Sequence, residues 1–237
     1  MKILIVIPAY NEENILAATI AKIVDFCQKN LTIDWQVVIA DNQSTDQTGI
    51  IGQKLARQYP AVSYLFVGQK GKGAAIRSGW QKNDADIYCF MDADLATDLS
   101  ALPRLIGEMA KGNDVVIGSR FAKGSRVKRS TIRQLFSLGY RLVLKILLAT
   151  KIKDTPCGFK AINNRVKKNI LALVKNQEWF FDSELVIMAE KQGYKIKEIP
   201  VAWHDPREGT DKSRVKPLAL SLAYFKQALA LRKRLKK

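Results

Sequence analysis

Residues 87–94 read IYCFMDAD, an unbroken apolar run followed at once by two aspartates. Five consecutive apolar residues predict a short strand buried on both faces, as in a parallel sheet. Asp92 and Asp94 then lie at the exposed end of that strand, and alternate residues of an extended chain point the same way. Both carboxylates could therefore bind one Mg²⁺ or Mn²⁺ ion, which prefers oxygen ligands. The other interpretation is a helix N-cap or a turn, where Asp is also favoured.

Similar apolar runs surround this strand and alternate with helical patterns. Further strands are expected at 2–7, 35–40, 62–67 and 115–118. One helix is expected at 14–29, a second between the segment 41–46 and about residue 59, and a third that begins at 70–73. The alternation predicts an α/β fold with a mostly parallel sheet and helices on both faces. Such sheets bind ligands beyond the carboxyl ends of their strands. The polar segments fall at those ends: 8–13, 41–46, 92–94 and 119–120.

Two of these segments, and a third loop at 70–73, are candidates for nucleotide binding. PAYNEE at 8–13 and DNQSTD at 41–46 supply short hydrogen-bonding groups suited to a base and a ribose. Their simpler interpretation is that they cap the helices that follow. KGKG at 70–73 places positive charge before a helix, which suits a phosphate, although a basic loop is often only solvated.

The charge of the chain is divided unevenly. Residues 1–119 carry 11 Lys/Arg and 13 Asp/Glu, whereas residues 120–237 carry 28 and 9. A basic half indicates a polyanionic partner, either nucleic acid or an anionic membrane surface. The segments 130–151 and 217–236 combine apolar arcs with flanking cations, so they could lie among lipid headgroups. The alternative is that they pack onto the sheet and leave their charges in water.

The cysteines and the apolar runs bear on localisation. Cys27, Cys89 and Cys157 lie far apart with no CxxC spacing, which favours a reducing compartment. The first residues do not resemble a signal peptide, and no run approaches the ~20 apolar residues of a spanning helix. We therefore expect a cytoplasmic protein that is soluble or peripheral to a membrane.

Seven segments in order resemble the motifs of family-2 glycosyltransferases: PAYNEE, DNQSTDQT, GKGAAIRSG, DADLATD, GSR, DTPCGFK and FFDSEL. The similarity is greatest to the dolichyl- or polyprenyl-phosphate glucosyl- and mannosyltransferases. The resemblance covers about residues 3–216 and implies a GT-A type fold. With the amphipathic patterns, we divide the chain into a transferase domain at 1–216, which includes an acceptor-side helix at 130–151, and a basic amphipathic helix at 217–237. The resemblance also implies inverting transfer of a hexose from a nucleotide-diphospho-sugar to dolichyl or polyprenyl phosphate at the cytosolic membrane surface.

The resemblance assigns roles by position. The nucleotide would be held by Pro8, Ala9, Tyr10, Glu12 and Asp41, with Lys72 at the phosphates. Asp92 and Asp94 match the diphosphate and metal motif for Mg²⁺ or Mn²⁺, with Asp94 favoured as the direct ligand, and we count both as catalytic. The acceptor phosphate would be held by Arg120, which we also count as catalytic, and by Arg133 and Ser137. A loop that closes over the diphosphate would contain Arg207, Lys212 and Ser213.

Other matched residues receive no individual role. Trp179, Phe181, Asp182 and Glu184 match a motif near the sugar or the acceptor. His204, the one histidine, is expected to be structural or close to the diphosphate.

The expected sugar donor follows from the motif pattern, whereas the expected acceptor follows from its charge. Mannosyl relatives often read DxDxQ, whereas the fifth position here is Ala96, so UDP-glucose is favoured over GDP-mannose. A phosphate acceptor is already anionic and needs positioning by arginines more than a general base. Whether a membrane-embedded partner protein takes part is left open.

Three alternatives remain. A family-2 transferase acting on a saccharide hydroxyl would need a carboxylate base, for which Asp154, Asp182 and Glu184 are available. A sugar-1-phosphate nucleotidyltransferase would begin with a glycine-rich basic loop, unlike PAYNEE. A nucleic-acid-binding protein would explain the charge, but the chain shows no zinc finger, RNA-recognition signature or heptad zipper, so no nucleic-acid partner is expected.

Overall fold

The computed structural model describes residues 1–128, 131–204 and 217–236, with the side chains of residues 131–136 and 217–222 left out. The strands are β1 (Lys2–Ala9), β2 (Asp34–Asp41), β3 (Val62–Phe66), β4 (Ile87–Met91), β5 (Val115–Ser119), β6 (Arg126–Lys128), β7 (Phe159–Asn163), β8 (Ile196–Pro200) and β9 (Ala202–His204). The helices are α1 (Leu16–Asn30), α2 (Thr48–Gln58), α3 (Lys72–Gln81), α4 (Ala101–Ala110), α5 (Thr131–Leu148), α6 (Asn164–Ile170), α7 (Phe181–Lys191) and α8 (Pro217–Leu235). The five strands expected from the sequence are confirmed.

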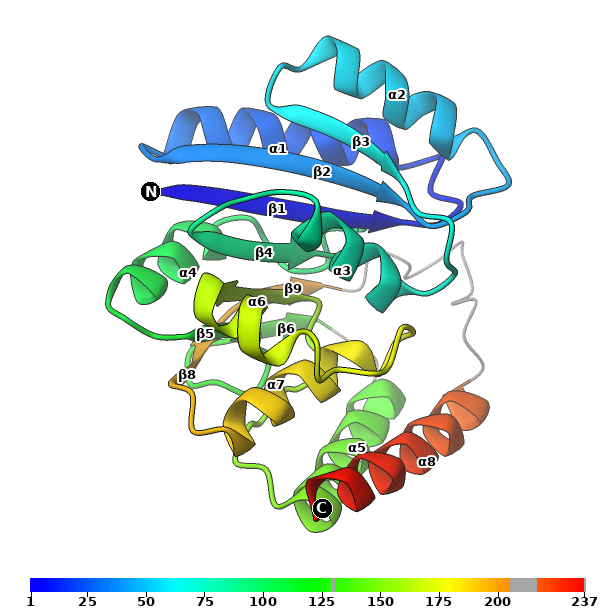
Figure 1. Ribbon diagram of the computed structural model, residues 1–237, viewed down its shortest axis with the longest axis vertical. Helices are drawn as coiled ribbons and strands as arrows, with labels where there is room; N and C mark the ends of the chain where they lie inside the picture. Colours follow the sequence, from blue (N-terminus) through cyan, green and yellow to red (C-terminus); the bar gives the residue numbers. More distant parts are fainter. Residues whose placement is uncertain (129–130, 205–216, 237) are drawn as a thin grey trace.

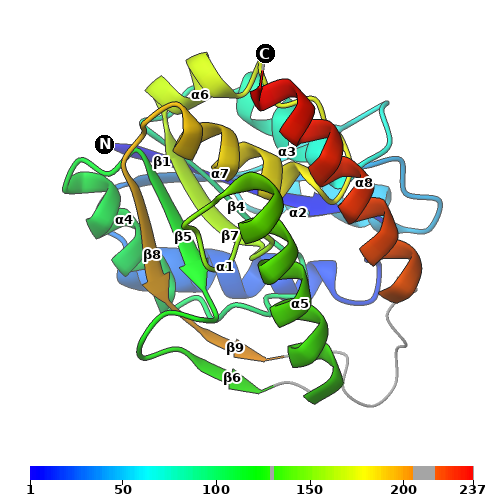
Figure 2. The same ribbon diagram turned by 90° about the horizontal axis from the view of Figure 1, so that it is seen from below.

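Seven strands form one sheet in the order β3-β2-β1-β4-β7-β5-β8. Strand β7 is antiparallel to both of its neighbours, and every other pair in this sheet is parallel. Helix α1 lies on one face, and α3 and α7 lie on the other (Figures 1 and 2). Buried between these layers, Ile3–Ile7 of β1 is fully inaccessible to solvent, as its β-branched run predicts. The mostly parallel sheet with helices on both faces is therefore confirmed.

The reversed strand β7 decides what lies beside the aspartates. Because β4 and β7 are antiparallel, the last residue of β4 pairs with the first of β7, Met91 with Phe159. Residues 154–158, which precede β7, therefore lie next to Asp92, whose backbone N–H donates to the Gly158 carbonyl (3.2 Å). The sequence alone did not predict this strand.

A small second sheet lies against the loop that follows β4, on the side of residues 96 and 97. Strands β6 and β9 pair in parallel, and Thr97 forms a bridge with Trp203. The His204 N–H also donates to the Ala96 carbonyl (3.0 Å). The segment that follows Asp94 is therefore held against β9.

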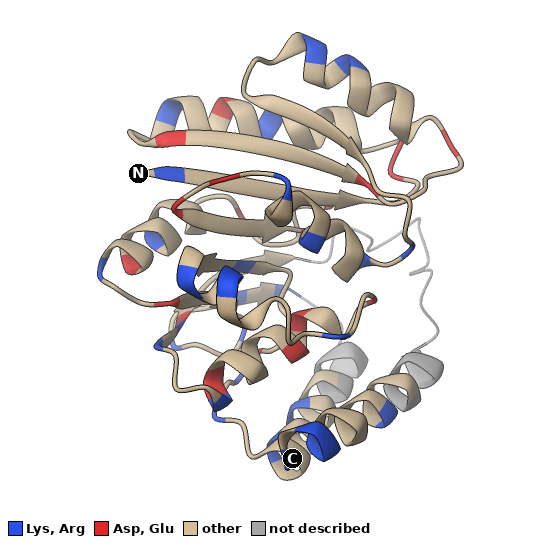
Figure 3. Ribbon diagram, in the orientation of Figure 1, with Lys and Arg blue, Asp and Glu red and all other residues tan. Residues whose placement is uncertain are grey.

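Helices α5 and α8 pack against each other below the sheet (Figure 1). The ring centroids of Tyr140 and Tyr224 are 5.0 Å apart, and Leu144 of α5 and Leu231 of α8 are buried. Figure 3 shows Lys and Arg on both helices, with a group at the C-terminal end of α8. Within the described residues, none of the helices combines the length and the hydropathy needed to cross a bilayer.

Candidate functional site

Asp92 and Asp94 begin the loop that leaves β4, and both side chains are partly exposed. The Ala93 carbonyl between them accepts a hydrogen bond from Thr19 Oγ1 of α1 (2.7 Å). Asp94 Oδ1 accepts from the Ala96 N–H (3.1 Å), and Leu95 takes a left-handed φ of 48°. Asp94 thus makes a turn contact, but neither aspartate caps a helix, because α4 begins only at Ala101.

Lys72, the first residue of α3, lies between two carboxylates. Its Nζ is 2.7 Å from Asp92 Oδ1 and 2.9 Å from Asp182 Oδ2, and its side chain is only 9% exposed. The ammonium also lies over the rings of Phe90 and Trp179. Burial by itself lowers the pKa of Lys72, but the charges of Asp182 and Asp92 outweigh it and raise that pKa. Lys72 is therefore a permanent cation beside the DAD motif.

The loops 8–13 and 41–48 are joined to each other. The Ser44 hydroxyl accepts from the Asn11 N–H (3.0 Å), and the Thr48 hydroxyl accepts from the Glu12 N–H (2.8 Å). Asn11 adopts a φ of 54°. At the start of α2, Asp46 Oδ1 accepts from the Thr48 N–H (2.9 Å), as the capping interpretation expects, and Glu13 Oε2 of the first loop accepts from the Gln47 N–H (2.9 Å). The two strand ends are thereby fixed side by side.

The residues assigned to the nucleotide lie along these two strand ends. Pro8 and Ala9 end β1 and pair with Ala40 and Asp41 of β2. Tyr10, which follows, is 44% exposed.

Asp41 is a buried acceptor with two protein donors. Its Oδ1 accepts from the Ser44 N–H (2.9 Å), and its Oδ2 accepts from the Tyr64 hydroxyl (2.7 Å). Burial, reinforced by Asp41, raises the pKa of Tyr64 to about 12. Tyr64 was not predicted; it comes from β3, where it pairs with Ile39.

Asn42 connects the second loop to the basic one. Its side chain accepts from the Gly71 N–H (2.6 Å) and donates to the Gln69 carbonyl (2.6 Å). Gly71 has a φ of 125°, and a Cβ there would lie 2.1 Å from the Gln177 carbonyl oxygen. Only glycine fits this position, and it sets the start of α3 and hence the place of Lys72.

Arg120 and Asp154 form a buried bidentate ion pair. Arg120 Nε donates to Asp154 Oδ2 (2.8 Å) and an Nη donates to Oδ1 (2.7 Å), while the Arg120 backbone N–H also reaches Oδ2 (2.8 Å). Burial opposes the charge on Asp154, but Arg120 more than offsets it and lowers the pKa of this carboxyl. The guanidinium also lies over the Trp203 ring. Arg120 is therefore locked in orientation, with part of its donor edge committed to Asp154.

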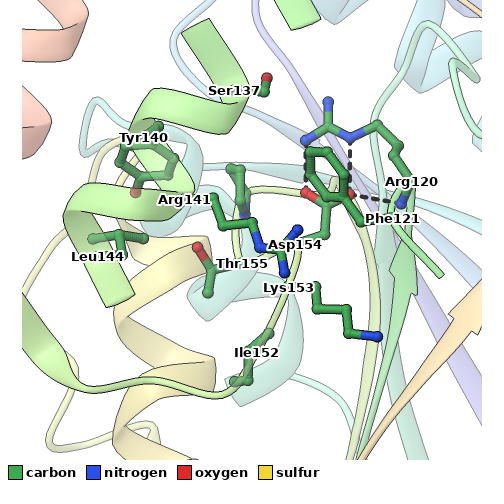
Figure 4. Close-up of a pocket in the computed structure, with 11 residues that line it drawn as sticks. Arg120, Phe121, Ser137, Tyr140, Arg141, Leu144, Ile152, Lys153, Asp154 and Thr155 are labelled. Carbon is green, nitrogen blue, oxygen red and sulfur yellow. Dashed lines mark hydrogen bonds and ion pairs between the residues drawn. The ribbon is translucent and has the colours of Figure 1, made fainter. Parts of the chain in front are cut away.

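A pocket opens beside this ion pair, between α5, the end of β5 and the segment 152–156 (Figure 4). Two residues predicted to hold an acceptor phosphate, Arg120 and Ser137, both line it. Arg141 and Lys153 line it as well. Neither of these was predicted; the helical spacing of Arg141, four residues after Ser137, is the signal that could have found it.

The two acidic residues of the FFDSEL segment differ in their contacts. Asp182 is buried against Lys72. Glu184 is buried too; its carboxylate accepts from the backbone N–H groups of Lys175 and Asn176 (both 2.9 Å) and pairs with Arg234 of α8. Glu184 therefore ties a loop and a helix together. Trp179 is 48% exposed, and its ring lies beside Lys72.

Some predicted residues lie outside the described part of the chain. Arg207, Lys212 and Ser213 belong to this group, as does the side chain of Arg133, whose backbone is in α5. His204 ends β9, where it pairs with Lys128 of β6 and its backbone N–H donates to the Ala96 carbonyl.

The donor set at Asp92 and Asp94 fits a hard divalent cation. Among the described residues, no three His, Cys, Asp or Glu side chains gather as an all-protein site would require. Asp92 already pairs with Lys72 through Oδ1, but one or two carboxylates are sufficient for Mg²⁺ or Mn²⁺, which completes its shell with water and substrate phosphates.

Comparison with known proteins identifies the family to which this chain belongs. Residues 4–171 match the model of "Glycosyl transferase family 2". A dolichyl-phosphate beta-glucosyltransferase of Saccharomyces cerevisiae is 31% identical over 85% of this chain and 66% of its own length. A dolichol-phosphate mannosyltransferase of Pyrococcus furiosus is 29% identical over 92% of this chain and 61% of its own length. The chain thus spans a little under two thirds of the length of these curated relatives.

Solved structures share the fold. Glucosyl-3-phosphoglycerate synthase from Mycobacterium tuberculosis, in complex with Mn²⁺, UDP and glucosyl-3-phosphoglycerate, superposes with a TM-score of 0.70. The match covers 99% of this chain and 79% of that one at 19% sequence identity. The GT-A type fold expected from the sequence is confirmed.

Proposed function

Because this chain belongs to glycosyl transferase family 2, we propose that it transfers a hexose, with inversion, from a nucleotide-diphospho-sugar to dolichyl or polyprenyl phosphate. The observation that carries the proposal is the pocket where Arg120 and Ser137 meet Arg141 and Lys153. Asp154 also lines this pocket and is paired with Arg120, so Arg141 and Lys153 leave a net positive charge that, with the Ser137 hydroxyl, suits a phosphate monoester.

The surface next to this pocket suits the lipid part of such an acceptor. Leu138, Leu142 and Ile146 are 48%, 57% and 68% exposed. Their spacing of four residues places them in one row along α5, and Ser137 in the pocket precedes the first of them. An exposed apolar row beside a cationic pocket fits a protein that rests on a membrane while it binds a lipid headgroup. On this proposal the protein works at the cytosolic face of the membrane.

The acidic residues also favour a phosphate acceptor over a saccharide hydroxyl. A hydroxyl must lose its proton to a base. Asp154 is fully buried and paired with Arg120, Asp182 is paired with Lys72, and Glu184 is committed to two backbone N–H groups and Arg234. A phosphate monoester needs no such base, because it is already an anion at neutral pH.

Asp92 and Asp94 would hold the divalent ion. Bound there, Mg²⁺ or Mn²⁺ would neutralise charge on the leaving nucleoside diphosphate. The Mn²⁺ in the structural relative supports this role, without choosing between the two metals. Lys72, a permanent cation that contacts Asp92, is placed to keep charge balanced around the diphosphate. Arg120, fixed by Asp154, would orient the acceptor phosphate for attack.

We propose UDP-glucose as the preferred donor and GDP-mannose as the next. Ala96 replaces the glutamine of the mannosyl pattern, and relatives of both kinds resemble this chain, with several named as glucosyltransferases. Asp41, buried between Ser44 and Tyr64, would bind the base or ribose.

The test is turnover by purified protein with polyprenyl phosphate, Mn²⁺ or Mg²⁺, and a panel of labelled nucleotide sugars. We expect glucosyl transfer from UDP-glucose, lost with EDTA. Asp94→Ala should lower turnover by at least ~1,000-fold, equal to about 4 kcal/mol of transition-state stabilisation. The control Asp98→Ala changes an exposed aspartate four residues after Asp94 in the same loop and should stay active. Normal turnover of Asp94→Ala in EDTA would refute the metal model, and salt-dependent duplex binding without sugar transfer would favour a nucleic-acid-binding protein.

A further inference from the structure

Lys160 of β7 is a charged residue buried completely in the interior, with 0% of its surface exposed. Its ammonium donates to the Cys157 carbonyl and lies over the Phe90 ring, 5.4 Å from its centroid. Burial lowers the pKa of Lys160, while the negative charges of Asp182 and Asp154 work against that fall. Burying a lysine ammonium costs free energy unless it is hydrogen-bonded or paired, so we expect Lys160 to have a structural role at this position.

The turn that Lys160 holds, residues 154–158, contacts both halves of the site. At one end, the Asp154 carboxylate accepts two hydrogen bonds from the Arg120 guanidinium, which lines the acceptor pocket. At the other end, the Gly158 carbonyl accepts from the backbone N–H of Asp92 (3.2 Å). Within the turn, the Cys157 N–H points back to the Asp154 carbonyl (3.4 Å). One short segment therefore links the arginine and the aspartate.

Gly158 makes this contact unusually close. A Cβ at this position would lie 1.8 Å from Asp92 Oδ2, so the carboxylate fills the space that any side chain would need. Together with the backbone hydrogen bond from Asp92 to Gly158, this close approach couples the position of the turn to that of Asp92, whose side chain is 37% exposed and so is not fixed by packing alone.

We propose that Lys160 is a positioning residue that fixes the 154–158 turn and thereby holds Arg120 and Asp92 in one mutual geometry. The role rests on the proposed function, since it supposes that Arg120 serves the acceptor phosphate and Asp92 the metal and diphosphate. Because Lys160 is fully buried, it would contact neither ligand. It acts through the Cys157 carbonyl, and outer partners of this kind tune the groups that bind directly.

The decisive experiment measures the two binding sites separately, without turnover. Isothermal titration gives the Kd of UDP with Mn²⁺ and, independently, the Kd of citronellyl phosphate, a short prenyl phosphate. Lys160→Met removes the donor to Cys157 at similar length. Gly158→Ala disturbs the turn at its Asp92 end and leaves Lys160 in place.

We expect Lys160→Met to weaken both ligands by about 10-fold, the usual effect of losing an outer partner. Gly158→Ala should weaken UDP with Mn²⁺ by a similar factor, and should also weaken citronellyl phosphate, although residue 158 does not line the acceptor pocket. The matched control is Ile162→Ala, two positions further along the same buried strand, which should change neither Kd by more than about 2-fold at a temperature where every variant is folded.

The proposal is overturned if Lys160→Met binds both ligands as the wild type does, or if the control weakens them equally. Should Lys160→Met not fold, Gly158→Ala decides: an effect confined to UDP with Mn²⁺ rules out a shared turn. Wild-type protein that binds UDP with Mn²⁺ but no prenyl phosphate would instead refute the proposed acceptor, and the UDP measurements would still decide whether Lys160 positions Asp92.

Discussion

The ammonium of Lys72 lies 2.7 Å from Oδ1 of Asp92, so a lysine from α3 neutralises one of the two carboxylates proposed to bind the metal. The same ammonium is 2.9 Å from Asp182 of α7. Helices α3 and α7 lie on the same face of the sheet, and a Cβ on Gly73 would overlap Phe181. The Lys72–Asp182 pair is therefore built on two helices in direct contact, which limits how far Lys72 can move.

Replacing Lys72 with methionine should destabilise the protein and impair donor binding. Removing one partner of a buried ion pair costs about 3–5 kcal/mol, because the other charge stays buried and unpaired. Here Asp182 bears most of that cost, since Asp92 is partly exposed. Urea unfolding gives the stability change, and titration gives the Kd of UDP with Mn²⁺. The control is Lys70→Met, which removes an exposed charge two residues away; if both variants behave alike, the buried pairing has no special role.

The Arg120–Asp154 pair should make stability depend on pH. The folded-state pKa of Asp154 is lowered, so its contribution is fully present above the unfolded value of about 3.9 and is lost as pH falls through the folded pKa. Asp154→Asn should therefore cost about 3–5 kcal/mol at pH 7, and the difference from wild type should shrink below about pH 4.

Urea midpoints measured between pH 7 and pH 3 test this. Asp25→Asn is the control, because Asp25 forms an exposed pair with Lys29 whose side chains are 61% and 69% accessible. A constant difference between wild type and Asp154→Asn across this range would show that the pair does not stabilise the fold in the manner described.

The exposed row on α5 should govern membrane attachment. Ile146→Ser removes an apolar side chain that is 68% exposed, so it should reduce liposome flotation with stability changed by less than about 0.5 kcal/mol. The matched change is Ile50→Ser on α2, where the isoleucine is 66% exposed. Equal losses from both variants would point to general hydrophobicity and not to α5.

Tyr64→Phe should weaken donor binding selectively. It deletes the hydroxyl that donates to Asp41 Oδ2, and a buried acceptor left without its donor costs about 1–3 kcal/mol. We expect a higher KM for the nucleotide sugar and an unchanged KM for the lipid phosphate. A rise in the lipid KM alone would remove Asp41 from the nucleotide site.

Much of the site could be predicted because its signals are local. Each buried strand is a continuous apolar run, and the polar residues follow directly where the run stops, as Asp92 follows Met91. Parallel strands bring those ends to one edge of the sheet whatever the side-chain details. The motifs in this order also identified the family, which the comparison then established.

The partners of those residues were not predictable in the same way. Tyr64 reaches Asp41 only because β3 pairs with β2 in a particular register. Asn42 reaches Gly71 across a gap of 29 residues. Nothing in the spacing of the sequence fixes such a register, because it depends on how whole strands and helices pack.

By itself, the sequence determined the strand ends, the carboxylate pair and the basic second half, since hydrophobic periodicity and composition are properties of neighbouring residues. Only the tertiary structure decided that β7 runs against its neighbours. This reversal sets Gly158 against Asp92, while Lys160 is buried beneath the turn and Asp154 is joined to Arg120. These contacts join groups far apart in the chain, and their energies depend on burial and distance, which exist only once the chain has folded.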